Sequence, residues 1–243
     1  MFCPVFKAHG APTPSRSGKL ALVNVAIGDL LPSALAVALS PIPIVAVVLV
    51  LGAPRARTAG PAFALGWIAG LVAVSVIVVL VLGTGHDSAT DDSGVDWLKV
   101  AIGVVFLLMA AQQWRKRPKE GREAKMPKWM ATIDTATPPR AAVLGLLLSG
   151  ANPKNLALTL AAAASIAEAG LGKGDTAIAI AVFVALGSLS VAGSVLFYLV
   201  DANRAARPLA TVKRFMSDNN AVIMMVVLLL LGVKLLGDGL GGL

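Results

Sequence analysis

Two short segments place prolines and polar side chains in the middle of apolar runs. Residues 39–43 read Leu-Ser-Pro-Ile-Pro, and residues 148–155 read Leu-Ser-Gly-Ala-Asn-Pro-Lys-Asn. A proline inside a helix has no N–H to bond the carbonyl four residues back, so each segment predicts a helix break with freed carbonyls. The residues of these two segments that we expect to line a binding or translocation site are Ser40, Pro41, Pro43, Ser149, Asn152, Pro153, Lys154 and Asn155.

The proline positions predict which carbonyls lose their helical partner. Pro41 is expected to free the carbonyl of Val37 and Pro43 that of Leu39, while Pro153 is expected to free that of Ser149. A free carbonyl in hydrocarbon costs several kcal/mol, so such breaks persist only inside protein or against a wet cavity. Two interpretations remain open here: a polar pocket shared by both segments, or proline kinks repaired by nearby serines.

Lys154 is the ionisable residue that the sequence places deepest. It lies 14 residues beyond Arg140, or about 21 Å along a helix, which is too far for its side chain to reach the interface. An ionisable residue inside a membrane span is a functional candidate. The predicted spans contain no Asp or Glu to pair with it. Lys154 must therefore be held by carbonyls or water, lose its charge, or meet an anionic ligand. The lack of carboxylates also argues against a proton relay or a metal-cation site.

The elements that would position these residues are membrane helices. The chain is 57% hydrophobic and 14% charged, against about 45–50% and about 25% in ordinary soluble domains. A spanning segment must satisfy its own backbone hydrogen bonds, so apolar runs of about 20 residues predict helices. We expect six spans, over residues 31–51, 62–82, 97–114, 141–164, 177–200 and 221–236.

Several function classes are excluded or disfavoured by composition. Cys3 is the only cysteine, which excludes a disulfide framework and cysteine-based zinc sites, and the two histidines lie outside the apolar runs. No phosphate-binding glycine loop, nucleophile elbow or metalloprotease motif is present. We therefore expect no catalytic residues, no metal and no cofactor.

The basic residues predict the orientation of the chain. Lys and Arg are concentrated in the loops after spans one, three and five, and are scarce in the loops after spans two and four. Basic loops face the cytoplasm, so both termini are expected outside and the chain is expected to be a multi-pass protein of the plasma (inner) membrane. The net charge of +8 then reflects membrane topology rather than binding to nucleic acid.

The two halves of the chain resemble each other. Spans one and four share a Leu-Ser pair followed by prolines, and spans two and five share Ala-Leu-Gly. A unit of three spans forces its second copy into the membrane from the opposite side, which is the inverted repeat typical of secondary transporters. We expect an all-α integral membrane fold divided into an N-terminal tail (1–22, disordered or upstream of the true start), a first repeat (23–114), a basic cytoplasmic loop (115–140) and a second repeat (141–243).

Four stretches carry a resemblance to a known family. Residues 27–51, 53–71, 149–158 (SGANPKNLAL) and 231–240 (LGVKLLGDGL) resemble the actinobacterial peptidoglycolipid-addressing (GAP) family, also described as sulfolipid-addressing. The Asn-Pro-Lys element is also similar to one in the wider lysine-exporter superfamily. The resemblance covers residues 24 to 243 and implies a six-helix, two-repeat inner-membrane protein that brings an envelope glycolipid to the surface. It supplies no catalytic residues.

These observations favour a transporter, or a transport component, for an anionic or glycosylated envelope lipid such as a glycopeptidolipid or a sulfolipid. In this hypothesis Lys154 meets a negative headgroup, and the expected partners are membrane lipids, the envelope glycolipid, a larger lipid exporter and further copies of the chain. One alternative is an exporter of small, amino-acid-like solutes. Another is a non-transporting scaffold for a larger lipid exporter, with the basic loop as its docking element.

Overall fold

The structure is a computed structural model that describes residues 16–83, 97–115 and 137–241. Those ranges contain helices and no strands. The predictions for residues 1–15 of the tail and 116–136 of the basic loop concern residues outside these ranges. The helices are α1 (Arg16–Ala38), α2 (Pro41–Gly52), α3 (Ala56–Gly83), α4 (Trp97–Arg115), α5 (Pro138–Gly150), α6 (Pro153–Glu168), α7 (Lys173–Gly187), α8 (Leu189–Val200), α9 (Ala202–Asp218) and α10 (Asn220–Leu240).

The prolines break the chain where the sequence predicts. Pro41 is the first residue of α2 and Pro153 the first residue of α6, a position where the missing N–H is not needed. A further break, between α7 and α8 at Ser188, was not predicted. It follows Gly187, and Gly-Ser pairs are known sites of helix kinks.

Two helices are by themselves long and apolar enough to cross a membrane: α3, over Ala56–Val81, and α10. The number rises to four if each of two bent pairs is one crossing, namely α1–α2, bent by 49°, and α7–α8, bent by 60°. Both numbers refer to the described residues alone. The α5–α6 pair and α4, which complete the six crossings expected from the sequence, are not among these candidates, so the count of six stays a prediction.

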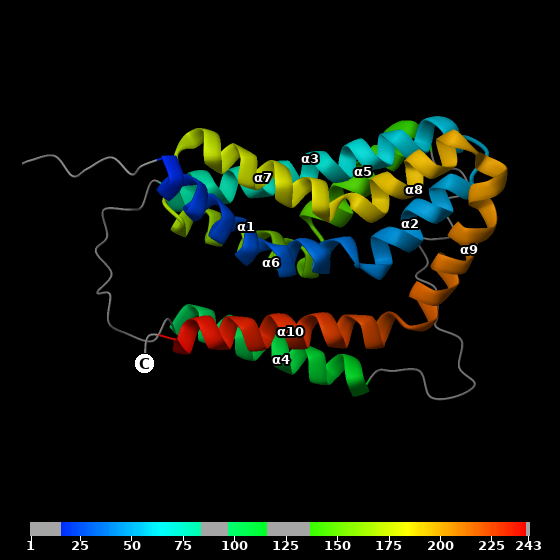
Figure 1. Cartoon of the computed structure of the whole chain (residues 1–243). Helices are drawn as coiled ribbons and strands as arrows, with labels where there is room; N and C mark the ends of the chain where they lie inside the picture. Colours follow the sequence, from blue (N-terminus) through cyan, green and yellow to red (C-terminus); the bar gives the residue numbers. More distant parts are fainter. Residues whose placement is uncertain (1–15, 84–96, 116–136, 242–243) are drawn as a thin grey trace, which may run out of the picture.

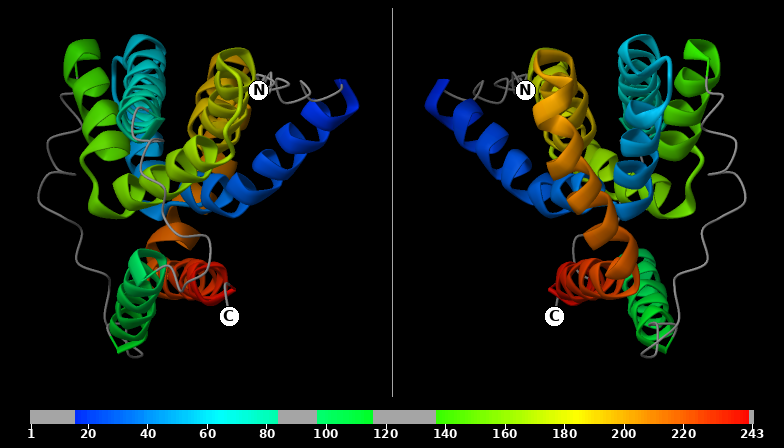
Figure 2. Two further views of the ribbon diagram at one scale, coloured as in Figure 1. Left: turned by 90° about the vertical axis from the view of Figure 1, so that its left-hand side faces the viewer. Right: turned by 90° about the vertical axis from the view of Figure 1, so that its right-hand side faces the viewer.

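The helices form a main body and a separate pair. In the body, α3 packs along α5, α1 packs against α6 and α7, and α2 packs against α3, α8 and α9. The pair consists of α4 and α10, which lie side by side below the body and are joined to it through α9 (Figures 1 and 2). Each bent pair extends from one end of the bundle toward the other, so each break lies between the two ends (Figure 1), although α1 leans away from the straight helices (Figure 2).

Glycines permit the two closest helix contacts. A Cβ added to Gly66 or Gly145 would overlap backbone atoms of the facing helix, so α3 and α5 touch backbone to backbone. Between α4 and α10, a Cβ at Gly103 would lie 3.0 Å from the Gly232 carbonyl, and a Cβ at Gly232 would lie 3.0 Å from the Gly103 carbonyl. Gly193 on α8 makes no such contact, because a Cβ there would meet nothing within 4 Å.

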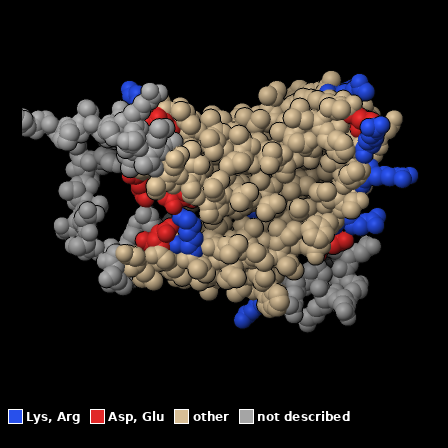
Figure 3. All heavy atoms as spheres, in the orientation of Figure 1, with Lys and Arg blue, Asp and Glu red and all other residues tan. Residues whose placement is uncertain are grey.

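Charged residues lie mainly at the two ends of the bundle. Figure 3 shows an uncharged belt along the helices, with most visible Lys and Arg atoms at the end formed by α9 and the α2–α3 turn. Acidic atoms are more frequent at the opposite end, near the start of α1 and the end of α10 (Figure 3). An apolar belt between two charged rims is the surface that a bilayer requires.

Candidate functional site

The break between α1 and α2 leaves carbonyls without helical partners, although not all those predicted. Ser40 N–H donates to the Val37 carbonyl at 3.1 Å, so the chain tightens into a three-residue turn. The expectation that Val37 would be freed was therefore wrong. In a regular α-helix Ser40 N–H would bond the carbonyl of Ala36. Because it bonds Val37 instead, the Ala36 carbonyl is the one left without a helical partner.

Donors from two other helices bind the freed carbonyls at the end of α1. Lys154 Nζ, from α6, donates to the Ala36 carbonyl at 3.3 Å, and Ser190 Oγ, from α8, donates to the Ala38 carbonyl at 2.6 Å. The Lys154 residue is only 8% exposed. The negative end of a helix dipole also favours a cation, so the last turn of α1 is a suitable place for a buried ammonium. Three broken helix pairs thus meet at the end of α1.

The break between α5 and α6 also leaves one carbonyl to a side chain, although its turn is wider, with an N–H bonded five residues back instead of three. Ala151 and Asn152 both donate through N–H to the Leu147 carbonyl, which leaves the Leu148 carbonyl to the Asn155 side-chain amide at 2.9 Å. The Asn152 side chain caps α6 by accepting from Lys154 N–H at 3.1 Å.

The two breaks match in detail. Ser40 has φ −67° and ψ 115°, and Asn152 has φ −69° and ψ 119°, each immediately before the proline that starts the next helix. The carbonyl taken by a side chain lies five residues before that proline in both cases, at Ala36 and at Leu148. Both donors, Lys154 and Asn155, come from the first turn of α6, so the second break also repairs the first.

The other residues predicted for the site are not all brought together. Ser40, Pro41 and Pro43 are buried at the first break. Ser149 is fully buried but faces α3: its Oγ donates to the Leu146 carbonyl at 3.1 Å, and a Cβ at Gly70 would overlap it. Pro153 is exposed. Ser149 therefore belongs to the α3–α5 contact, and Lys154 and Asn155 remain as the polar centre.

Two serines of the third break were missed from the sequence. Ser190 binds α1, and Ser188, which is 3% exposed, lies at the break itself. A Cβ at Gly187 would come within 3.3 Å of Val37, so a glycine lets this break approach the first one. The available signal was the run Gly-Ser-Leu-Ser at 187–190 inside an apolar span.

The centre retains hydrogen-bonding capacity. Within the described part of the chain, Asn155 Oδ1 and Ser188 Oγ are buried and have no hydrogen-bond partner. The Lys154 ammonium has three donors, and among the described residues it has one bond, to Ala36, and no ion pair. The ammonium and the Ser188 hydroxyl can donate to a ligand that carries negative charge, whereas Asn155 Oδ1 can only accept a hydrogen bond. Across the described ranges no group of three or more His, Cys, Asp or Glu is placed to hold a metal.

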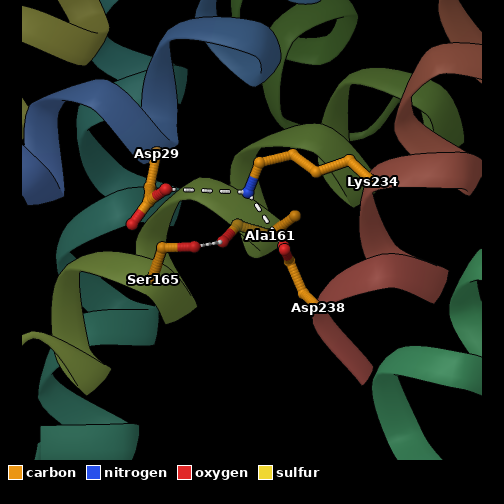
Figure 4. Close-up of polar contacts among 5 residues, drawn as sticks. All are labelled: Asp29, Ala161, Ser165, Lys234 and Asp238. Carbon is orange, nitrogen blue, oxygen red and sulfur yellow. Dashed lines mark hydrogen bonds and ion pairs between the residues drawn. The ribbon is translucent and has the colours of Figure 1, made fainter. Parts of the chain in front are cut away.

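A second polar cluster lies nearer the end of the bundle and links α1 to α10. Lys234 Nζ is 2.9 Å from Asp238 Oδ2 and 3.9 Å from Asp29 Oδ1, and both carboxylates point toward it (Figure 4). Lys234 and Asp238 are one helical turn apart on α10, the spacing at which opposite charges pair. Asp29 lies within α1, which begins at Arg16.

We expect the Lys234 cluster to contribute little to stability. The three side chains are 32%, 54% and 46% exposed, and ion pairs of this exposure are worth about 0–1 kcal/mol. Double-mutant cycles on the purified protein should give a larger coupling energy for Lys234→Met with Asp238→Asn than with Asp29→Asn, because the latter pair is 1 Å longer. A coupling above about 2 kcal/mol for either pair would contradict this assessment.

Residues 30–241 match the family described as Sap, sulfolipid-1-addressing protein (SfLAP). The chain belongs to this family. No curated protein and no solved structure matches the chain. The match contains all three helix breaks, so the polar centre is part of the family region, and it associates the SfLAP chain with the addressing of lipid to the envelope.

Proposed function

We propose that this SfLAP chain is an inner-membrane transporter, or the membrane part of one, that delivers an anionic or glycosylated envelope lipid to the cell surface. The observation that carries the proposal is the buried ammonium of Lys154 at the meeting point of three helix breaks. The family supplies the lipid class, since its description names a sulfolipid. A sulfate or phosphate headgroup has the charge and the acceptor oxygens that this centre would bind.

The proposed architecture is six crossings in two inverted repeats. The packing supports it, because the contacts are reciprocal: the second crossing of one half lies on the first crossing of the other, as in α3 on α5 and α7–α8 on α1–α2. The third crossings, α4 and α10, pair with each other through the mutual approach of Gly103 and Gly232. A two-fold axis between the halves would produce this pattern.

In the proposed orientation both termini lie outside and the basic end faces the cytoplasm. The gathering of Lys and Arg at one end of the bundle supports this orientation (Figure 3). A headgroup would enter from the basic end and reach Lys154 between the breaks. Because the ammonium is held by a single carbonyl bond of 3.3 Å, it could exchange Ala36 for a headgroup oxygen without leaving its place.

The test is a comparison of surface and total lipids in cells with and without the gene. We expect one envelope lipid to be made at the normal total level but to be depleted from the surface in the deletion strain. Restoring the gene should restore the surface fraction. Unchanged surface lipids would refute the proposal and direct attention to small-solute efflux.

A scaffold that serves a larger exporter would give the same deletion result, so it is tested separately. Cross-linking and co-purification of the tagged chain would identify a larger exporter as partner. If a Lys154 variant keeps that complex but still fails to deliver lipid, the chain acts on the lipid itself. If lipid delivery is lost only when the complex is lost, and is unaffected by substitution of Lys154, the scaffold interpretation replaces the proposal.

A further inference from the structure

The helix α9 combines a strongly basic face with a buried apolar face. Ala205 and Leu209 are buried, and α9 packs against α2 and α8. On the opposite face Arg204, Arg207 and Arg214, spaced by three and seven residues, are exposed. Asp201 caps the helix at its start, accepting from Arg204 N–H at 3.0 Å, and its carboxylate also forms an ion pair with Arg204 Nε at 3.1 Å.

Between these two faces lies an exposed apolar strip. Pro208, Val212 and Phe215 are spaced by four and three residues and so share one side of the helix. Val212 is 39% exposed and Phe215 is 56% exposed. A bulky apolar side chain beside a row of arginines is the side-chain pattern of helices that lie in a membrane interface.

The position of α9 matches that pattern. It crosses the end of the bundle between α8 and α10, and in the end-on view it lies across the ends of the other helices (Figure 2). Asp201 alone separates it from Val200, the last residue of α8, which is 86% exposed. The apolar surface of α8 therefore leads into α9 at the level where hydrocarbon gives way to headgroups.

We propose that α9 is a membrane-surface helix that binds anionic lipid headgroups through Arg204, Arg207 and Arg214 while Phe215 and Val212 enter the acyl-chain boundary. Its positive charge, and its continuity with the bilayer-facing surface of α8, indicate that the binding partner of α9 is a lipid surface. An arginine near an anionic surface is worth about fivefold in binding, so Arg207 and Arg214, which do not share the carboxylate of Asp201, together favour an anionic leaflet about 25-fold. This role concerns bulk membrane lipid and does not depend on what the polar centre transports.

The experiment uses the full-length protein in lipid nanodiscs. Cys3 is the only cysteine, so a Cys3→Ser background allows a single spin label at position 215 (Phe215→Cys) or, as a matched control, at position 210 (Ala210→Cys), an exposed position on the face of Arg207 and Arg214. In discs containing phosphatidylglycerol, we expect the label at 215 to be severalfold more accessible to oxygen than to a water-soluble nickel chelate. The label at 210 should show the reverse.

Charge-neutralising variants test the headgroup contact. The triple variant Arg204→Gln/Arg207→Gln/Arg214→Gln should make the oxygen and nickel accessibilities of the 215 label independent of phosphatidylglycerol. The control variant Arg55→Gln/Arg57→Gln removes exposed charge from the α2–α3 turn and the first turn of α3. It should keep the dependence of the 215 label on phosphatidylglycerol. Circular dichroism and gel filtration confirm that each variant is folded.

Three results would overturn the proposal. One is a label at 215 that stays in water with and without phosphatidylglycerol. Another is a triple variant that keeps the full lipid dependence. The last is the same shift produced by inorganic phosphate in discs of neutral lipid, which would show that α9 recognises a free anion and not a membrane surface.

Discussion

Replacing Lys154 by Met is expected to reduce the surface fraction of the envelope lipid by about tenfold or more, with normal amounts of folded protein. Hydrogen bonds to charged groups contribute about 1.5–3 kcal/mol, and removal of the ammonium deletes the charged donor at the polar centre. The measurement is the ratio of surface to total lipid in a deletion strain that carries the variant. Full delivery by Lys154→Met would refute the role of the charge.

The same substitution should change stability little. It leaves the Ala36 carbonyl without its donor, but it also removes a charge from a buried position, and the two effects oppose each other. We therefore expect the free energy of unfolding in detergent to change by about 1 kcal/mol or less.

Ser190→Ala is the matched control for Lys154→Met. It removes the hydroxyl that binds the neighbouring carbonyl, that of Ala38, without changing any charge. An unpaired buried carbonyl costs about 1–3 kcal/mol, so this variant should be less stable but should still deliver lipid. If Lys154→Met and Ser190→Ala lower stability equally and both leave delivery intact, Lys154 only repairs the broken helix.

Replacing Gly66 by Ala is expected to cost about 3 kcal/mol or more of folding free energy. The new Cβ would overlap the backbone of Ala142, and a backbone cannot rotate away as a side chain can, so α3 and α5 must separate. Thermal unfolding in detergent, together with the monodisperse yield on gel filtration, measures the loss.

Two further variants show whether the contact itself is responsible. Gly193→Ala adds the same methyl group to α8 where nothing lies within 4 Å, and it should be neutral or slightly stabilising. Gly70→Ala meets mainly the Ser149 hydroxyl, so adding Ser149→Ala should recover part of its stability. A Gly66→Ala protein as stable as Gly193→Ala would show that α3 and α5 are not in backbone contact.

Much of the local structure could be predicted from residue types alone. Pro41 and Pro153 were expected to break the helix, because a proline cannot donate to the preceding turn, and a helix restarts at each, whereas Pro32, Pro61 and Pro208 lie within helices. Lys154 had to be held by a carbonyl, by water or by an anion, because the spans contain no carboxylate, and a carbonyl holds it. The break at Ser188 lacks a proline, so its weaker Gly-Ser signal was missed.

Helical patterns along one chain do not say which distant carbonyl a side chain reaches, and only the tertiary structure decided that. Ser40 bonds Val37 and so frees Ala36, a shift of one residue that proline chemistry alone does not predict. Lys154 and Ser190 then reach α1 from 118 and 152 residues away, which depends on how α1 packs against α6 and α8.

Composition and proline positions determined that this protein has an apolar helical fold with breaks and a lysine without a carboxylate partner. The packing of the two halves determined that the breaks meet, because each freed carbonyl needs a donor and only another part of the chain supplies one.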